Sequence, residues 1–167
     1  MRKALVIFGI IMTIATTSFA QKAIGVRFGT GLASSIGAEL SYQQPLNNNR
    51  LEIDFGAIAG FSIGSDDYNS FSLSLTAAYQ WKFNIVNGFN WYVGPAASGG
   101  LYFVHYDKTF EGPTLGLGGQ LGIEYDFSSK GVPLQVSLDT RPMFNLLSPQ
   151  ESRGYNVSAC FSLRYSF

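Results

Sequence analysis

The chain has 167 residues, of which 13% are charged and 15% are aromatic, and its formal net charge is zero. An average soluble domain carries about 25% charged residues, so this composition is unusual for a protein whose whole surface faces water. The balanced charge excludes the basic footprint of a nucleic-acid-binding protein, and the single cysteine, Cys160, excludes an internal disulfide.

Residues 1–20 are expected to be a secretory signal peptide. A basic start precedes an apolar run from Ala4 to Ala15, and small residues at Ser18 and Ala20 fit a cleavage site at the end of the segment. The apolar run is shorter than the ~20 residues that a membrane-spanning helix needs. The rest of the chain, residues 21–167, is expected to form one domain with nine basic and eleven acidic residues.

Beyond residue 20, apolar and polar residues alternate in segments that are separated by clusters of turn residues. This alternation is typical of β-strands with one dry face, and no window has helical periodicity of useful length. Eight strands are expected at about residues 22–32, 36–42, 51–57, 71–83, 89–103, 115–127, 134–141 and 156–167. Pro95 and the Gly99-Gly100 pair favour a bulge or bend. The sequence therefore does not decide which side chains of residues 95–105 lie on the polar face and which on the apolar face.

The connections between the strands are short turns and three longer loops. Short turns are expected at residues 33–35, 45–49, 87–88 and 128–133, and Asn87-Gly88 is a typical hairpin pair. The longer loops are expected at about Ile63–Ser70, Val104–Pro113 and Asn145–Tyr155. None of the three carries a recognisable binding motif.

Ten charged residues fall inside the expected strands, and all ten lie opposite the apolar face; the other charged residues beyond residue 20 lie in turns or at strand edges. The other residues on the polar face are mainly Gly, Ser, Ala and Thr, which suit the narrow interior of an eight-stranded barrel. Because a charge in a narrow lumen needs a partner, we expect a structural network of ion pairs there; a gated or proton-conducting path is the alternative. The expected network residues are Arg27, Glu39, Glu52, Asp54, Glu124, Asp139, Arg141 and Arg164, with Lys82 and Asp126 on the same face.

Within this network, Asp139, Arg141 and Arg164 are expected to be neighbours on the last two strands. On the apolar face, aromatic residues such as Trp81, Trp91 and Tyr165 flank one set of turns. An aromatic girdle of this kind is typical of a membrane interface. The pattern therefore predicts an all-β fold, an eight-stranded antiparallel up-and-down transmembrane β-barrel.

Three segments resemble a known family: the Phe161-x-Leu163-x-Tyr165-x-Phe167 ending, Asn90–Gly94 and Leu138–Pro142. The chain resembles the small outer-membrane β-barrel proteins of the OmpA/OmpX-like, porin-family type, particularly those of Bacteroidetes-like bacteria, over nearly all of residues 21–167. The resemblance implies that the outer-membrane assembly machinery reads the terminal strand through Phe161, Leu163, Tyr165 and Phe167. It also implies a monomer in the outer membrane of a Gram-negative cell, in contact with lipids and lipopolysaccharide, with both termini periplasmic.

A structural or surface-interaction role in the cell envelope is the expected function, without catalysis, cofactor or metal. One alternative is a lipid-modifying enzyme, which needs a histidine-activated serine. His105 is the only histidine, and Tyr106 and Asp107 follow it instead of a closely spaced serine. The other alternative is a soluble lipocalin-like barrel that binds a ligand in an apolar interior.

Overall fold

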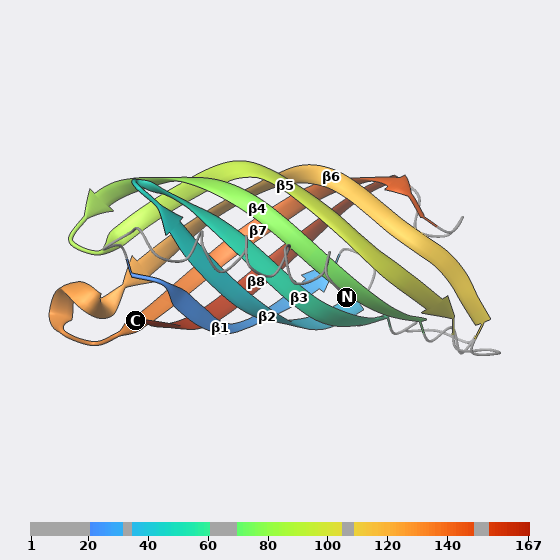
Figure 1. The fold of residues 1–167 in the computed structure, drawn as a ribbon, viewed down its shortest axis with the longest axis horizontal. Coiled ribbons are helices and arrows are strands. Elements are labelled where there is room, and N and C mark those ends of the chain that lie inside the picture. Colours follow the sequence, from blue (N-terminus) through green and yellow to red (C-terminus); the bar gives the residue numbers. More distant parts are fainter. Residues whose placement is uncertain (1–20, 32–34, 61–69, 105–108, 149–153) are drawn as a thin grey trace, which may run out of the picture.

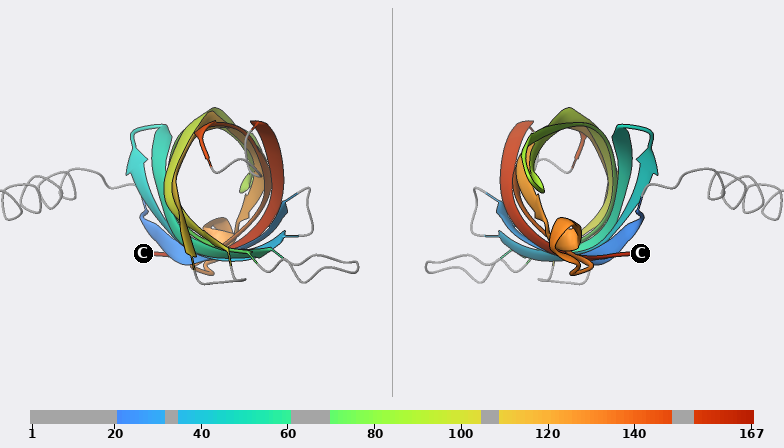
Figure 2. Two further views of the ribbon diagram at one scale, coloured as in Figure 1. Left: turned by 90° about the vertical axis from the view of Figure 1, so that its right-hand side faces the viewer. Right: turned by 90° about the vertical axis from the view of Figure 1, so that its left-hand side faces the viewer.

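The computed structural model describes residues 21–31, 35–60, 70–104, 109–148 and 154–167, so the expected signal peptide lies outside the described residues. Eight strands form a closed ring in which each strand pairs with its neighbours in sequence order, and β8 pairs back to β1. All these pairings are antiparallel. Figure 1 shows the strands crossing the barrel obliquely, and Figure 2 shows the ring from its two ends. The predicted eight-stranded up-and-down barrel is confirmed.

The strands differ considerably in length. They are β1 (Ala23–Gly31), β2 (Ser35–Leu46), β3 (Asn49–Gly60), β4 (Ser70–Val86), β5 (Phe89–Val104), β6 (Thr109–Asp126), β7 (Leu134–Leu147) and β8 (Gly154–Ser166). A short 3-10 helix, η2 (Phe127–Lys130), lies between β6 and β7. Among the described residues, no helix is long and apolar enough to span a membrane.

One end of the barrel, which we call the turn end, carries the tight connections. Asn47 and Asn48 join β2 to β3, and Asn87 and Gly88 join β4 to β5. Asn87 has a φ of 28° and Gly88 a φ of 86°, and two-residue hairpin turns favour such positive angles because they match the strand twist. The strand ends β1 and β8 also meet here, where the backbones of Lys22 and Phe167 exchange hydrogen bonds of 3.0 and 2.8 Å.

The strands extend further than the sequence predicts at the opposite end of the barrel. β6 begins at Thr109, within the expected 104–113 loop, and its first residue pairs with Val104 of β5. Likewise β7 continues to Leu147 and β8 begins at Gly154, so the expected 145–155 loop is shorter. Charged residues, proline and glycine suggested loops in these segments. Backbone pairing across the ladder decides the strand ends instead, because it does not depend on side-chain polarity.

β5 continues without a change of register through the segment where a bulge was expected. Its pairing with β4 passes from Ala78–Ala96 to Trp81–Val93 in one register, and register shifts occur near its two ends instead. Pro95 faces outward, and proline has no N–H to donate to a ladder. A bulge at residues 95–100 is therefore absent, since one missing donor is tolerated within a long continuous ladder.

The barrel has a polar interior and an apolar exterior. Along β3, Arg50, Glu52 and Asp54 are buried, whereas Ile53 and Phe55 between and beyond them are exposed. The buried apolar residues of the described chain are few and mostly small: Ala23, Ala78, Tyr92, Ala96 and Cys160. The strand period of two therefore places charged side chains inside the ring and large apolar side chains outside it.

Candidate functional site in the barrel lumen

Glu52 lies at the centre of the lumen and accepts hydrogen bonds from three arginines. Its Oε1 atom is 2.7 Å from Nη1 of Arg27 and 2.9 Å from Nη2 of Arg141, and its Oε2 atom is 3.0 Å from Nη2 of Arg164. Gln43 and Gln120 donate their side-chain amides to the same carboxylate. Glu52 and two of these arginines, Arg27 and Arg164, are almost completely buried, so the carboxylate and its partners fill the interior of the barrel at this level.

Arg27 and Arg141 also bind the other central carboxylates. Arg27 lies 2.8 Å from Asp139 and 3.0 Å from Glu39. Arg141 lies 3.2 Å from Glu39 and makes a close ion pair with Asp54. Each of these two guanidinium groups therefore contacts carboxylates from several strands, which is the arrangement that a planar group with five N–H donors allows.

Arg164 has a different set of partners from the one expected. Its side chain donates to Ser41 at 2.9 Å, to Ser137 at 2.8 Å and to Glu52. In the β7–β8 ladder Arg164 lies opposite Gln135, four residues from Asp139. The expectation that Asp139, Arg141 and Arg164 neighbour one another was wrong for Arg164. Asp139 and Arg141 share the inner face of β7, whereas Asp139 binds Arg27 of β1, and Arg164 shares only the carboxylate of Glu52 with Arg141.

A second cluster surrounds Glu124, nearer the turn end. Arg50 makes a close ion pair with Glu124, and Nζ of Lys82 lies 2.7 Å from the same carboxylate. The Arg50 guanidinium also lies over the ring of Tyr92, 4.6 Å from its centroid, in a cation–π arrangement. The Tyr92 hydroxyl donates to Asp139 at 2.9 Å, so this aromatic side chain connects the two clusters.

Glutamine side chains form a second connection between the clusters. Arg50 donates to Gln80, Gln80 donates to Gln120 at 2.9 Å, and Gln120 donates to Glu52 at 3.1 Å. The ion pairs of the described residues join five bases to five acids, so these ten side chains carry no formal net charge. They are Arg27, Arg50, Lys82, Arg141 and Arg164 with Glu39, Glu52, Asp54, Glu124 and Asp139.

The eight lumen residues named from the sequence all lie in these two clusters, but several partners were missed. Arg50 was missed because the third strand was expected to begin one residue later, although it lies two residues before Glu52 on the same face. Tyr92 was missed because it is an aromatic residue on the polar face, where Gly122 of β6 leaves room for its ring. Asp126 lies outside the clusters: its carboxylate accepts from the Ser128 N–H at 2.9 Å and caps η2.

The terminal strand places its apolar residues on the outside of the barrel. Phe161, Leu163, Tyr165 and Phe167 are exposed, and the residues between them are buried. Tyr165 stacks on Phe167 with ring centroids 6.4 Å apart. Near the turn end, Phe83 stacks on Trp91 at 4.5 Å. Outward aromatic side chains therefore gather at the end of the barrel where the chain termini meet.

The enzyme alternative rests on His105, which lies outside the described residues. Within the described ranges, no group of three or more His, Cys, Asp or Glu side chains is arranged to hold a metal ion. The lumen acids that lie close together are bound by arginines instead.

No protein-family model matches the chain, and no curated protein matches it in sequence. Among solved structures, Neisserial surface protein A is 15% identical, with a TM-score of 0.68, covering 90% of this chain and 98% of that one. Ail, the attachment invasion locus protein of Yersinia pestis, is 14% identical over 89% of this chain and 97% of its own, with a TM-score of 0.49. A chain from a de novo design of transmembrane β-barrels is 15% identical over 90% and 98%, with a TM-score of 0.43. At 15% identity, the similarity to Neisserial surface protein A shows a shared fold alone.

Proposed function

We propose that this chain is an integral outer-membrane β-barrel with a structural or surface-interaction role in the cell envelope and no catalytic activity. The observation that carries the proposal is the inverted burial of the barrel. Large apolar side chains from all eight strands are exposed on the outside, whereas the buried interior is mainly polar and charged. Soluble monomers rarely expose contiguous apolar patches above a few hundred Å², and membrane barrels expose such a band to lipid.

Closure of the sheet supports the same proposal. In lipid, every backbone N–H and C=O needs an internal partner, and a closed ring has no unpaired strand edge. Here β1 pairs with β8 from Ala23 to Gly31, so the ring is complete. A soluble lipocalin-like barrel would instead need an apolar interior for its ligand, and this lumen holds ion pairs.

The proposed orientation places the turn end and both termini in the periplasm. The outward aromatic residues near this end, such as Trp91 and Phe167, would lie at the periplasmic membrane interface, where amphipathic rings are enriched. The terminal residues Phe161, Leu163, Tyr165 and Phe167 would be read by the outer-membrane assembly machinery. We place the chain in the OmpA/OmpX-like, porin-family group as a monomer surrounded by outer-membrane lipids and lipopolysaccharide.

The lumen clusters would act as a plug that stabilises the barrel. Three arginines converge on Glu52 from different strands and fill the interior at this level. A conducting pore would need a continuous aqueous path. We therefore expect the barrel, reconstituted in a planar bilayer, to give no sustained single-channel current.

Membrane fractionation tests the proposed location. The full chain, expressed with its first twenty residues in a Gram-negative host, should be recovered in the outer-membrane fraction. It should resist extraction by alkaline carbonate or urea and require detergent to dissolve. Recovery in the soluble periplasmic fraction without detergent would overturn the proposal. Release from the membrane by carbonate would also overturn it, because it would show a peripheral protein.

A further inference from the structure

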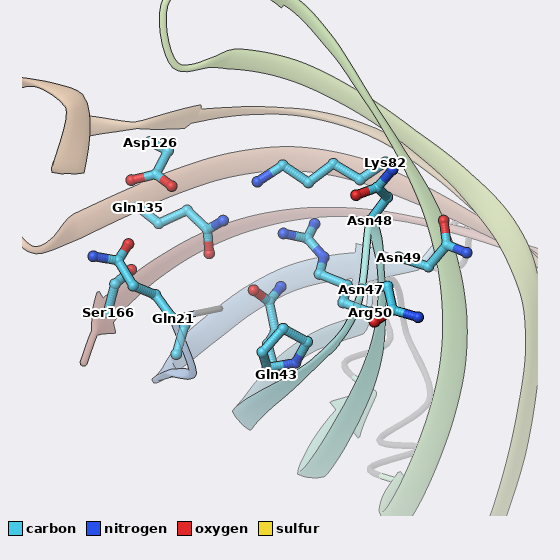
Figure 3. A pocket seen from close by; sticks show the side chains of 12 residues that line it. Gln21, Gln43, Asn47, Asn48, Asn49, Arg50, Lys82, Asp126, Gln135 and Ser166 are labelled. Carbon is cyan, nitrogen blue, oxygen red and sulfur yellow. The ribbon is translucent and has the colours of Figure 1, made fainter. Parts of the chain in front are cut away.

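A polar cavity of about 150 Å³ opens at the turn end of the barrel. Figure 3 shows the side chains of Lys82, Arg50, Gln43 and Gln135 pointing toward a common space, with Asp126 on one side. Drug-sized ligands occupy pockets of roughly 300–1,000 Å³, whereas one water needs only ~10–15 Å³ of such space. The cavity is therefore of a size for a small organic molecule.

The β3–β4 wall of this cavity carries an excess of positive charge. Arg50 and Lys82 share one carboxylate, Glu124, and no other described acid lies within ion-pair distance of either. Arg50 is 5% exposed, and its Nη2 atom has no hydrogen-bond partner among the described residues. Two cationic side chains on this wall therefore share one carboxylate, which leaves the wall with a formal charge of +1.

The opposite wall, formed by β7 and the end of β6, presents acceptors. Gln135 is 4% exposed, and its Oε1 atom also has no hydrogen-bond partner among the described residues. One oxygen of Asp126 accepts from the Ser128 N–H, and a carboxylate has further lone pairs to offer. This wall is therefore suited to a cationic or N–H donor group, and it disfavours a second anion.

From these two walls we infer that the turn-end cavity binds a small molecule that carries both a carboxylate and an amino group, such as a free amino acid or the end of a short peptide. The carboxylate accepts from Arg50 and Lys82, and the amino group donates to Gln135 and Asp126. This site goes beyond the proposed envelope role. In the proposed orientation it opens to the periplasm.

Chemical-shift titration of the folded, isotopically labelled protein in detergent micelles tests this site. Glycine, acetate, methylammonium chloride and glycylglycine are added separately at constant ionic strength. Glycine or glycylglycine should shift the backbone amides of Asn49, Arg50 and Gln135 saturably, at concentrations at least about tenfold below those needed for acetate or methylammonium. Tighter binding of glycylglycine assigns the site to peptide ends, and tighter binding of glycine assigns it to free amino acids.

Two variants and a matched control connect the binding to the named residues. Lys82→Gln should weaken glycine binding by about tenfold or more, since a hydrogen bond to a charged group is lost, while Arg50 still pairs with Glu124. Gln135→Met should weaken glycine binding by about threefold or more, since one of the two acceptors of the amino group is lost while Asp126 remains, and it should leave acetate binding unchanged. Lys130→Gln removes the same charge from an exposed residue outside the cavity and should change the affinity less than about twofold.

Several outcomes would overturn the inference. Shifts that rise linearly without saturation, or that acetate and sodium chloride produce equally well, would mean that the cavity holds only water and loosely bound ions. Unchanged binding in both variants would place the ligand elsewhere. The titration is independent of membrane fractionation, so a failure here leaves the proposed location untouched, and the reverse also holds.

Discussion

Arg141 of β7 and Glu52 of β3 form an ion pair with 2.9 Å between Nη2 and Oε1, although their strands lie at opposite positions in the ring of eight. The pair therefore crosses the full width of the lumen. Arg27 of β1 and Arg164 of β8 reach the same carboxylate. Glu52 on β3 is thus connected to β7, β8 and β1 on the opposite side of the barrel.

The central carboxylate is expected to dominate the stability of the lumen. Glu52 is the only acid among the described residues that forms an ion pair with Arg164, so Glu52→Gln leaves Arg164 buried and unpaired. Removing one partner of a buried pair costs about 3–5 kcal/mol, and the urea unfolding midpoint in micelles should fall accordingly. The control is Glu39→Gln, which should lower the midpoint less, because Arg27 keeps its ion pair with Asp139 and Arg141 keeps its ion pair with Asp54. An equal fall of the unfolding midpoint in the two variants would contradict the special role of Glu52.

Reversing the charge of Arg141 should prevent folding. Arg141→Glu would place a carboxylate beside Glu39, Glu52 and Asp54, which the guanidinium now binds. Like charges in a buried site repel strongly, so Arg141→Glu should lower the folded fraction more than the neutral variant Arg141→Met does. The folded fraction is read from the heat-dependent mobility of the barrel on a detergent gel. Folding close to wild type would be evidence against a structural network.

Gly122 should tolerate no side chain. An added Cβ atom would lie 2.5 Å from the Cβ of Asp139 and 2.6 Å from the hydroxyl oxygen of Tyr92, so Gly122→Ala should destabilise the barrel by about 1–3 kcal/mol. Gly119→Ala on the same strand is the control, since its nearest contact is ordinary, at 3.4 Å. Unfolding curves for both variants check this, and equal stability would mean that Tyr92 moves aside without cost.

The two tryptophans should report the depth of the barrel in lipid. Trp81 and Trp91 are the only tryptophans in the chain, and both are outward and near the turn end. In vesicles their emission should shift to shorter wavelength. Lipids brominated near the headgroup should quench it more than lipids brominated at the chain ends. Trp81→Phe and Trp91→Phe assign the signal to each position. No quenching by either lipid would show that these side chains do not contact the membrane.

Phe167 is expected to matter for assembly in the cell more than for stability. Its side chain is 59% exposed and its described ring contact is with Tyr165, so Phe167→Ala should refold in micelles within about 0.5 kcal/mol of wild type. In cells, the amount reaching the outer membrane should fall severalfold. Phe144→Ala, outward and 55% exposed on β7, is the control. Equal amounts of the two variants in the outer membrane would show that Phe167 has no special role in assembly.

The strands and their facing could be predicted because both follow from a local period of two. Alternation along Leu51–Ala57 or Phe161–Phe167 reports which side chains face one way, whatever those strands later pair with. Strand ends followed a different rule. Thr109–Pro113 has the composition of a loop but pairs with the end of β5, since hydrogen bonding between backbones extends a ladder beyond the residues that composition favours.

The sequence by itself determined that the chain is an eight-stranded barrel with one dry face and its charges on the other. Only the tertiary structure decided which charges meet. Arg27 and Asp139 lie 112 residues apart in the chain, and the ion pairs of Arg141 cross the lumen to β3. Strand alternation carries no information about such distances. The register of the β7–β8 ladder set the level of Arg164 along the axis, and so placed it beside Ser137 and Glu52 instead of Asp139.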